Sequence, residues 1–295
     1  MSNVAVIDLG TNTFHILIVT LGKLGKFDII YRERRYVYLG GQGIDEIGPE
    51  SFQRGIETLQ YFSTILSKFE IADVKAIGTA ALRSAKNGKE FVDAANEKTG
   101  INISIITGDQ EAIYIAKGIS RIYPKQRPHL IMDIGGGSVE FIIGSTQIDW
   151  HQSFDIGISV LYQRFMRSDP IYSDDLKAMH LYLADQLKPL KEALKQYPSY
   201  DLIGAAGTFE VLASHQNRPT DLPLQLLESN LIRHLYTQVL SLDRSQRIEI
   251  DGIPSHRGQY LVVALALIMA TVDLINLDEV YVSSYSLKEG VLLDF

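Results

Sequence analysis

The chain has 295 residues, a formal net charge of −7 and no cysteine, and 46% of its residues are hydrophobic. This length and apolar content suit about two globular domains of roughly 100–200 residues each, which excludes wholesale disorder. Without cysteine the chain can form no disulfide, thiolate zinc site or iron–sulfur cluster, which fits a reducing cytoplasm. The acidic balance argues against a broad nucleic-acid surface, but it leaves room for a local anion site.

No membrane segment is predicted. An apolar run begins at Val4 without a basic leader before it, so no signal peptide is expected. The longest apolar stretch, residues 260–272, is too short to cross a bilayer and predicts a buried helix. We therefore expect a cytoplasmic protein whose partners include neither a membrane nor nucleic acid.

The first half of the chain indicates a mixed α/β domain. Residues 4–8 and 14–19 are apolar runs around a polar turn with Gly10 and Asn12, which predicts a β-hairpin. Residues 27–39 are rich in β-branched and aromatic types and extend the sheet. Further strands are predicted at 74–78 and 103–107, with helices at 51–69, 85–100 and 109–120, the last capped by Asp109. A block of strands followed by strand–helix alternation is typical of a mixed sheet.

The second half repeats this layout after a predicted linker at 121–129. Residues 130–144 again form an apolar strand, an Asp-x-Gly turn and a second apolar strand, and Asp133 follows Asp8 by 125 residues, one domain length. Helices are expected at 173–196, 222–240, 259–275 and 286–295, with a strand, turn and helix start at 201–213 and a strand at 279–284. The predicted domains are 1–123 and 124–295, and the last helix, about 285–295, is expected to be able to pack back on the first domain.

Asp8 and Asp133 each end a buried strand, where a carboxylate needs hydrogen bonds or a cation. Either residue alone could simply organise a turn. Both, however, are followed by small residues whose N–H and hydroxyl groups can converge on phosphate oxygens. These residues are Gly10, Thr11, Asn12 and Thr13 after Asp8, and Gly135, Gly136, Gly137 and Ser138 after Asp133. Two facing turns of this kind predict that a phosphate chain is held between the domains.

Several other residues could carry chemistry, each with a structural alternative. Glu111 lies in the first turn of its helix, where it could act as a base toward water or simply stabilise the helix end. Glu140 could share a metal with Asp133 or be a polar strand residue. Arg83 suits phosphate by its bidentate geometry but could be a surface residue. His15 is expected to be a hydrogen-bonded core residue.

Two further patterns are less specific. Residues 204–208 form a third glycine-rich turn after a strand, and the chain contains no Walker or dinucleotide-binding glycine pattern. The basic segments 32–35 and 125–127 predict solvated surface that could extend a basic path for a polyanion.

An ordered set of motifs resembles the exopolyphosphatase and guanosine pentaphosphate phosphohydrolase family, within the actin and sugar-kinase superfamily. In chain order the motifs are Asp8-Leu-Gly10-Thr-Asn12-Thr-Phe-His15, Gly78-Thr79-Ala-Ala-Leu82-Arg83, Gly108-Asp-Gln-Glu111-Ala112, Asp133-Ile-Gly135-Gly-Gly137-Ser138-Val-Glu140, Gly204-Ala-Ala-Gly207-Thr208 and Leu287-Lys-Glu289-Gly290-Val-Leu. The chain departs from the family pattern at Gln110, Gln259, Ala264, Ser283-Ser284-Tyr285 and Lys288. These departures leave the phosphate motifs intact and concern the ligand contacts of the second domain.

The resemblance implies two actin-like (ribonuclease H-like) domains with mixed sheets flanked by helices and an active site in the interdomain cleft. It implies Mg²⁺-dependent hydrolysis of the terminal phosphoanhydride of inorganic polyphosphate or guanosine pentaphosphate, with release of phosphate. By the resemblance Glu111 is the general base, Asp133 and Glu140 hold the metal, and the phosphates contact Asp8, Gly10, Thr11, Asn12, Thr13, Arg83, Gly135, Gly136, Gly137, Ser138, Gly207 and Thr208.

Two other functions stay open at this point: a non-catalytic phosphate- or nucleotide-sensing protein, and an ATP-dependent small-molecule kinase of the same superfamily. The sequence does not decide between polyphosphate and the alarmone, and it leaves a homodimer open as the assembly.

Overall fold

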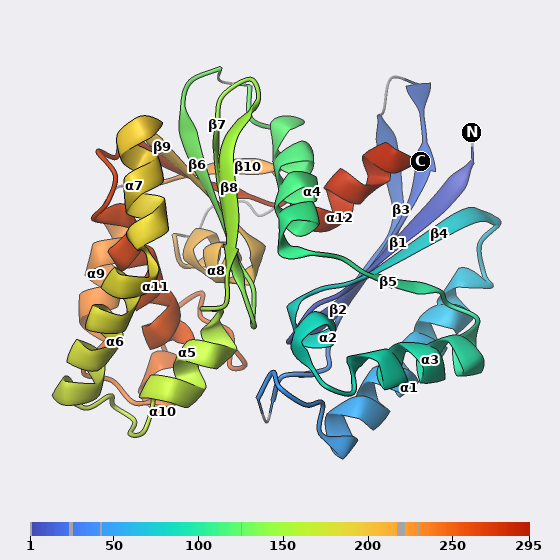
Figure 1. Cartoon of the computed structure of the whole chain (residues 1–295), viewed down its shortest axis with the longest axis horizontal. Helices are drawn as coiled ribbons and strands as arrows, with labels where there is room; N and C mark the ends of the chain where they lie inside the picture. The colour runs from blue at the N-terminus through green and yellow to red at the C-terminus, as the bar shows by residue number, and fades with distance from the viewer. Residues whose placement is uncertain (1, 24–25, 42, 125, 217–221, 229) are drawn as a thin grey trace. The chain divides into compact units, whose positions relative to one another are not determined.

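The computed structural model divides into two compact units, each built on one mixed β-sheet (Figure 1). The structure describes residues 2–23, 26–41, 43–124, 126–216, 222–228 and 230–295. The first unit comprises Met1–Gly118, Gly135–Gly137 and Leu287–Phe295, and the second comprises Ile119–Ile134 and Ser138–Ser286. The predicted α/β class, with helices flanking two mixed sheets, is confirmed.

The first unit has a sheet of order β3-β2-β1-β4-β5. Its strands are β1 (Asn3–Leu9), β2 (Thr13–Leu21), β3 (Phe27–Tyr36), β4 (Ile71–Gly78) and β5 (Ile103–Ile105). Its helices are α1 (Pro49–Leu66), α2 (Ala80–Ser84), α3 (Gly88–Thr99), α4 (Gly108–Ser120), α12 (Leu287–Val291) and the short 3₁₀ helix Leu292–Asp294. On β1 and β2, alternate apolar residues such as Ile7 and Ile16 pack in one core with Leu59 of α1 and Phe91 of α3, so Asp8 and His15 belong to the opposite face.

The second unit has a sheet of order β10-β11-β9-β6-β7-β8. Its strands are β6 (His129–Ile134), β7 (Val139–Gly144), β8 (Ile148–Phe154), β9 (Asp201–Ala205), β10 (Leu224–Leu227) and β11 (Glu279–Ser283). Its helices are α5 (Ile158–Phe165), α6 (Ser173–Gln186), α7 (Lys188–Gln196), α8 (Ala206–His215), α9 (Leu231–Val239), α10 (Arg244–Arg247) and α11 (Leu261–Val272).

The two sheets have the same topology, with β3-β2-β1-β4-β5 of the first sheet corresponding to β8-β7-β6-β9-β11 of the second. In the first, β1 pairs antiparallel with β2 and parallel with β4, while β2–β3 is antiparallel and β4–β5 parallel. In the second, β6 pairs antiparallel with β7 and parallel with β9, while β7–β8 is antiparallel and β9–β11 parallel. Strand β10 is an added antiparallel edge. The repeated architecture predicted from the spacing of Asp8 and Asp133 is therefore confirmed.

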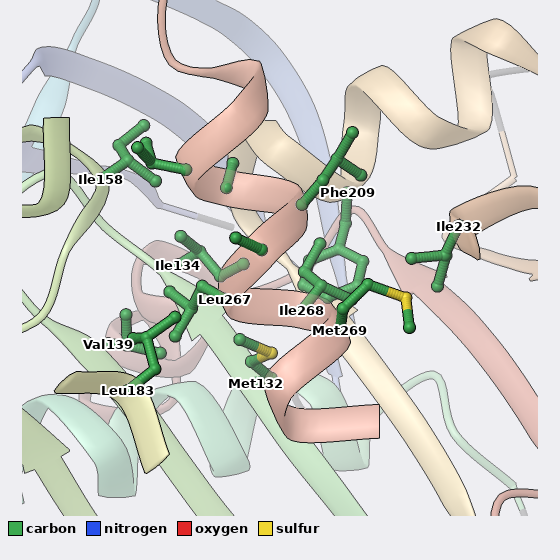
Figure 2. Packing of buried hydrophobic residues seen from close by; sticks show 14 of the residues in the cluster. Met132, Ile134, Val139, Ile158, Leu183, Phe209, Ile232, Leu267, Ile268 and Met269 are labelled. Atoms are coloured by element: carbon green, nitrogen blue, oxygen red, sulfur yellow. The ribbon is translucent and has the colours of Figure 1, made fainter. Parts of the chain in front are cut away.

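Helix α11 is the centre of the second core (Figure 2). Leu267, Ile268 and Met269 of this helix lie among side chains from α8 and β6, including Phe209 and Met132. A helix that is apolar all round must be covered on all sides. The predicted buried helix at 259–275 is therefore present, in the shorter span of α11, and it anchors the elements that carry the second and third glycine turns.

Two predicted helices were wrong in detail, and several short elements were missed. Residues 222–240 were expected to be one helix, but β10 precedes α9 because residues 224–227 pair with β11. Residues 173–196 split into α6 and α7, since Pro189 stands in the first turn of α7 and cannot continue α6. Short elements at α2, α5, α10 and β8 were not predicted.

Helix α4 is capped by Thr107 and not by Asp109. The Gln110 N–H donates to Thr107 Oγ1 at 3.2 Å, and the Thr107 N–H donates to Gln110 Oε1 at 3.0 Å. This reciprocal pair is a capping box, whose Thr-x-x-Gln signature is present in the sequence. Asp109 instead lies in the first turn beside Glu111.

The predicted linker at 121–129 is held to the second unit at several points, although Lys125 lies outside the described residues. The Tyr123 hydroxyl donates to Asp201 Oδ2 at 2.5 Å, and Arg127 Nε lies 3.3 Å from the same oxygen. Asp201 is fully buried, so it needs these donors. Tyr123 and Arg127 are therefore both held to β9 within the second unit.

Candidate phosphate and catalytic site

The turn between β1 and β2 is held by its own backbone. The Gly10 N–H donates to the Thr13 carbonyl at 3.0 Å, and the Asn12 carbonyl accepts from the N–H groups of Val37 and Tyr38, each at 3.0 Å. Thr11 is buried. These bonds fix the backbone of the Gly10–Thr13 turn, which is the property an anion-binding turn requires.

Two glycines of the second motif lie against this turn, within the first unit. A Cβ on Gly136 would lie 2.8 Å from Asn12 Nδ2 and 2.9 Å from Thr11 Cβ. A Cβ on Gly137 would lie 2.9 Å from Thr11 Oγ1 and 2.9 Å from Ala80 Cβ. Real Cβ atoms avoid such distances, so both positions require glycine for the second turn to lie against these side chains. Thr11 is thus the meeting point of the first glycine turn, the second glycine turn and the start of α2.

Glu111 is buried at the start of α4 and paired with Arg83 of α2. Arg83 Nη1 donates to Glu111 Oε2 at 3.1 Å and to the Ile106 carbonyl at 3.0 Å. A carboxylate with an ionic partner and an anchored orientation can serve as a base toward one fixed position. The structure therefore brings two of the predicted site residues, Arg83 and Glu111, into direct contact.

Asp8 occupies the carboxyl end of β1, on the sheet face opposite the α1–α3 core. Its Cα partner across the antiparallel ladder is His15 on β2. His15 is only partly buried, and its Nε2 lies 3.1 Å from Thr13 Oγ1. The expectation that His15 is hydrogen-bonded is confirmed, but the expectation that it is a core residue is wrong, because it faces the same side of the sheet as Asp8.

Asp133 and Glu140 are direct partners across the β6–β7 ladder, and both are buried. The Ser286 hydroxyl donates to Asp133 Oδ2. The hydroxyls of Ser138 and Ser153 donate to Glu140 Oε1 at 2.8 and 2.7 Å. Residues directly opposite on an antiparallel pair point to one face, so the two carboxyl groups are neighbours.

The carboxylate oxygens of Asp133 and Glu140 are ligands of the type that Mg²⁺ binds. The described residues contain no group of three or more His, Cys, Asp or Glu side chains arranged to hold a metal ion. Mg²⁺, however, is commonly bound through one or two carboxylates together with water and substrate phosphate. Asp133 and Glu140 offer that many oxygen ligands, and both are already oriented by serine hydroxyls.

The third glycine turn begins α8 next to an arginine that the sequence analysis missed. Gly207 and Thr208 are both buried in the first turn of α8. A Cβ on Gly207 would overlap the guanidinium of Arg257, so this side chain lies directly over the turn. Arg257 lies in the loop before α11 and belongs to no recognisable sequence motif. Only the fold brings it to Gly207.

A family model described as the Ppx/GppA phosphatase family matches residues 18–295. The chain belongs to this family. The match spans most of the predicted motifs, whereas the Asp8–Thr13 segment precedes the matched range. The family resemblance drawn from the motifs is therefore confirmed.

Two similar solved structures match this chain over nearly its whole length. A crystal structure described as an exopolyphosphatase from Cytophaga hutchinsonii is 37% identical, with a TM-score of 0.94, and the match covers 99% of this chain and 97% of that one. A Ppx/GppA enzyme from Aquifex aeolicus is 24% identical at a TM-score of 0.83, covering 100% of this chain and 99% of that one, and supports the fold alone.

The similar curated proteins are longer than this Ppx/GppA chain. Guanosine-5'-triphosphate,3'-diphosphate pyrophosphatase from Vibrio parahaemolyticus is 27% identical over 98% of this chain, and the match covers 58% of that protein. The homologous protein of Aliivibrio fischeri is also 27% identical, with 58% of its length covered. The chain thus spans little more than half the length of these relatives. Among the helices described here, none has the length and apolar character needed to cross a membrane.

Proposed function

We propose that the chain is a phosphoanhydride hydrolase that removes the terminal phosphate of inorganic polyphosphate, and that guanosine pentaphosphate is a second substrate. The similarity to an exopolyphosphatase at 37% identity over nearly the whole of both chains supports the first substrate. The curated pyrophosphatase relatives support the second.

The pairing of Arg83 with the buried Glu111, in the same unit as the Gly10–Thr13 turn, is the observation that carries the proposal. In the proposed reaction Glu111 orients a water molecule and takes up its proton while the water oxygen bonds to the terminal phosphorus. The bond from that phosphorus to its bridging oxygen breaks, and inorganic phosphate leaves. Phosphoryl transfer depends on such positioning and on charge neutralisation more than on covalent catalysis.

The phosphate-binding groups in the proposal are backbone N–H groups and small polar side chains. They come from Thr11, Asn12 and Thr13 after Asp8, from Gly135 to Ser138, and from Gly207 and Thr208. The contact of Gly136 and Gly137 with Thr11 supports the pairing of the first two turns at one anion. Arg83 adds a positive charge beside Glu111 and offers further N–H donors for phosphate.

We further propose that the reaction depends on Mg²⁺, held by Asp133 and Glu140. When bound there, the ion would neutralise charge on phosphate oxygens. The protein's own contribution is to keep both carboxyl groups oriented: Ser286 donates to Asp133, and Ser138 and Ser153 donate to Glu140.

The test is phosphate release from polyphosphate and from guanosine pentaphosphate by wild type and by Glu111→Gln, with and without Mg²⁺. The proposal expects release by wild type with Mg²⁺ and a loss of about 10²–10⁴-fold in Glu111→Gln, the usual scale for a general base. Tight binding without release by either protein would instead favour a phosphate sensor. Transfer of phosphate from ATP to a small molecule would favour a kinase.

A further inference from the structure

One row of the first sheet carries charged and titratable side chains from three strands. Asp8 on β1 is the partner of His15 on β2, and His15 is the partner of Arg34 on β3. Directly paired residues point to the same face of a sheet. Since neighbouring strands lie about 4.8 Å apart, the Cα of Arg34 is roughly 10 Å from that of Asp8.

The contacts on the other face of β3 confirm this orientation. Tyr61 of α1 donates its hydroxyl to Glu33 Oε2 at 3.1 Å, and the Arg35 guanidinium lies 3.6 Å from the centre of the Tyr61 ring. Glu33 and Arg35 therefore face α1. Side chains alternate along a strand, so Arg32 and Arg34 face the side that carries Asp8.

This side of β3 is positively charged and open to solvent. Strand β3 is an edge strand. Arg32 is exposed and Arg34 partly exposed, whereas Leu17, the partner of Arg32, is fully buried. By register the described residues of β3 on this face are Phe27, Ile29, Arg32, Arg34 and Tyr36, and none of them is acidic. Two arginines two residues apart, about 6.8 Å along the strand, present their charge at the same edge.

The position of the arginines relative to the glycine turn suggests what they bind. The Gly10–Thr13 turn begins two residues after Asp8, so a chain of phosphates with its end at that turn can continue across β2 toward the open edge. Guanidinium groups bind phosphate by charge-assisted hydrogen bonds. A short anion held at the turn has no need of cations at the far edge, whereas a long one gains from them.

We propose that Arg32 and Arg34 form a second anion subsite, which binds a stretch of polyphosphate beyond the end held at the Gly10–Thr13 turn and so gives the protein a preference for long chains. The inference rests on the proposed function, because it extends the binding of the same substrate. It assigns Arg32 and Arg34 a role in substrate selection, separate from the chemistry at Glu111.

The experiment compares Arg34→Ala, Arg32→Ala and the double variant with wild type on tripolyphosphate and on long-chain polyphosphate. Each arginine variant is expected to raise KM for the long chain roughly three- to tenfold, as expected for a partly exposed ionic contact. KM for tripolyphosphate should stay within about twofold, and kcat should be unchanged on both. Arg34→Lys should keep most of the long-chain preference, and the salt dependence of long-chain binding should become shallower in Arg34→Ala.

Arg35→Ala is the matched control, because it removes the same charge from the same strand on the α1 face. It should not alter the ratio of the two KM values. Equal effects of Arg34→Ala and Arg35→Ala, or equal losses on short and long substrates, would overturn the subsite. If wild type releases no phosphate from either substrate, the proposed hydrolysis fails by itself. Direct binding of tripolyphosphate and of long-chain polyphosphate to wild type and Arg34→Ala then tests the subsite. Weaker binding of the long chain alone by Arg34→Ala supports it, and equal binding by both proteins overturns it.

Discussion

One nitrogen of Arg83, Nη1, donates both to the Glu111 carboxylate at 3.1 Å and to the Ile106 carbonyl at 3.0 Å. Ile106 directly precedes the capping residue of α4, Thr107. The guanidinium therefore joins α2 to the first turn of α4 and fixes the carboxylate relative to both. Loss of this group would remove an ionic partner from a buried carboxylate, which is costly for a buried charge.

The first prediction concerns this pair. Arg83→Ala should lower phosphate release at least tenfold and destabilise the fold by about 1–3 kcal/mol, because Glu111 loses a charged donor in a buried position. Arg83→Lys should recover part of the stability, since an ammonium can reach one acceptor but lacks the planar fork. Urea unfolding and phosphate release should be measured on the same preparations. Activity unchanged in Arg83→Ala would remove Arg83 from the site.

The second prediction contrasts two glycines of the third turn. A Cβ on Gly204 would overlap the ring of Phe209, which is fully buried in the second core. Gly204→Ala should therefore cost about 3 kcal/mol or more, because the ring has nowhere to move. A Cβ on Gly207 would meet the far end of Arg257, which is a flexible side chain.

Gly207→Ala should accordingly change stability by less than about 1 kcal/mol while displacing Arg257. If the third turn contacts phosphate, phosphate release should fall in Gly207→Ala although the protein remains folded. Thermal unfolding and KM for polyphosphate, measured for both variants, separate the two effects. A Gly207→Ala protein as unstable as Gly204→Ala would show that Arg257 cannot give way.

The third prediction tests the approach of the second glycine turn to α2. Gly137→Ala should destabilise the protein by about 1–3 kcal/mol, because the new methyl group would lie 2.9 Å from both Thr11 Oγ1 and Ala80 Cβ. Ala80→Gly removes one of the two obstacles at a small cost of its own in helix propensity. The double variant should be less destabilised than the sum of the single variants, as measured by urea unfolding in a double-mutant cycle. Strict additivity would mean that the two residues do not meet.

The sequence predicted the strands that carry the site better than the groups that surround them. The hairpin turns after Asp8 and Asp133 follow from local patterns, namely an apolar run that ends in Asp-x-Gly, and the structure has both. The serines that donate to Asp133 and Glu140 were missed in part: Ser138 belongs to the motif, but Ser153 and Ser286 come from distant segments. The pairing of β7 with β8 brings Ser153 to Glu140. The fold of the segment after β11 brings Ser286 to Asp133.

Competing local signals explain two of the errors. At α4, Asp109 is a good capping residue by type, but the reciprocal pair of Thr107 and Gln110 satisfies two backbone groups at once and places the cap two residues earlier. The segment 224–227 has only four residues, three of them leucine, so periodicity alone does not separate helix from strand. The available edge of β11 decides for strand.

The side-chain carboxylate of Asp294 provides the fourth prediction. The Tyr114 hydroxyl donates to Asp294 Oδ2 at 2.6 Å, Lys117 Nζ lies 3.0 Å from Oδ1, and Lys75 Nζ donates to the Asp294 carbonyl at 2.6 Å. The Tyr114 hydrogen bond, followed by Lys117, lowers the pKa of Asp294, and the same bond to Asp294 raises the pKa of Tyr114 to about 12. Asp294 thus fastens the end of the chain to α4 and β4.

Asp294→Asn should destabilise the first unit by roughly 1 kcal/mol at neutral pH. Because the folded pKa of Asp294 is lowered, its contribution is present above the ordinary Asp pKa and lost as pH falls through the folded value. Because the folded pKa of Tyr114 is raised, its contribution is present below its ordinary value and lost as pH rises toward about 12. The stability difference between wild type and Asp294→Asn should therefore be largest at neutral pH and shrink at both extremes in urea unfolding.

Asp93→Asn, which alters an exposed pair with Lys89 on α3, is the control and should change stability by less than about 0.5 kcal/mol. A difference between wild type and Asp294→Asn that does not vary with pH would contradict the ionic role of Asp294.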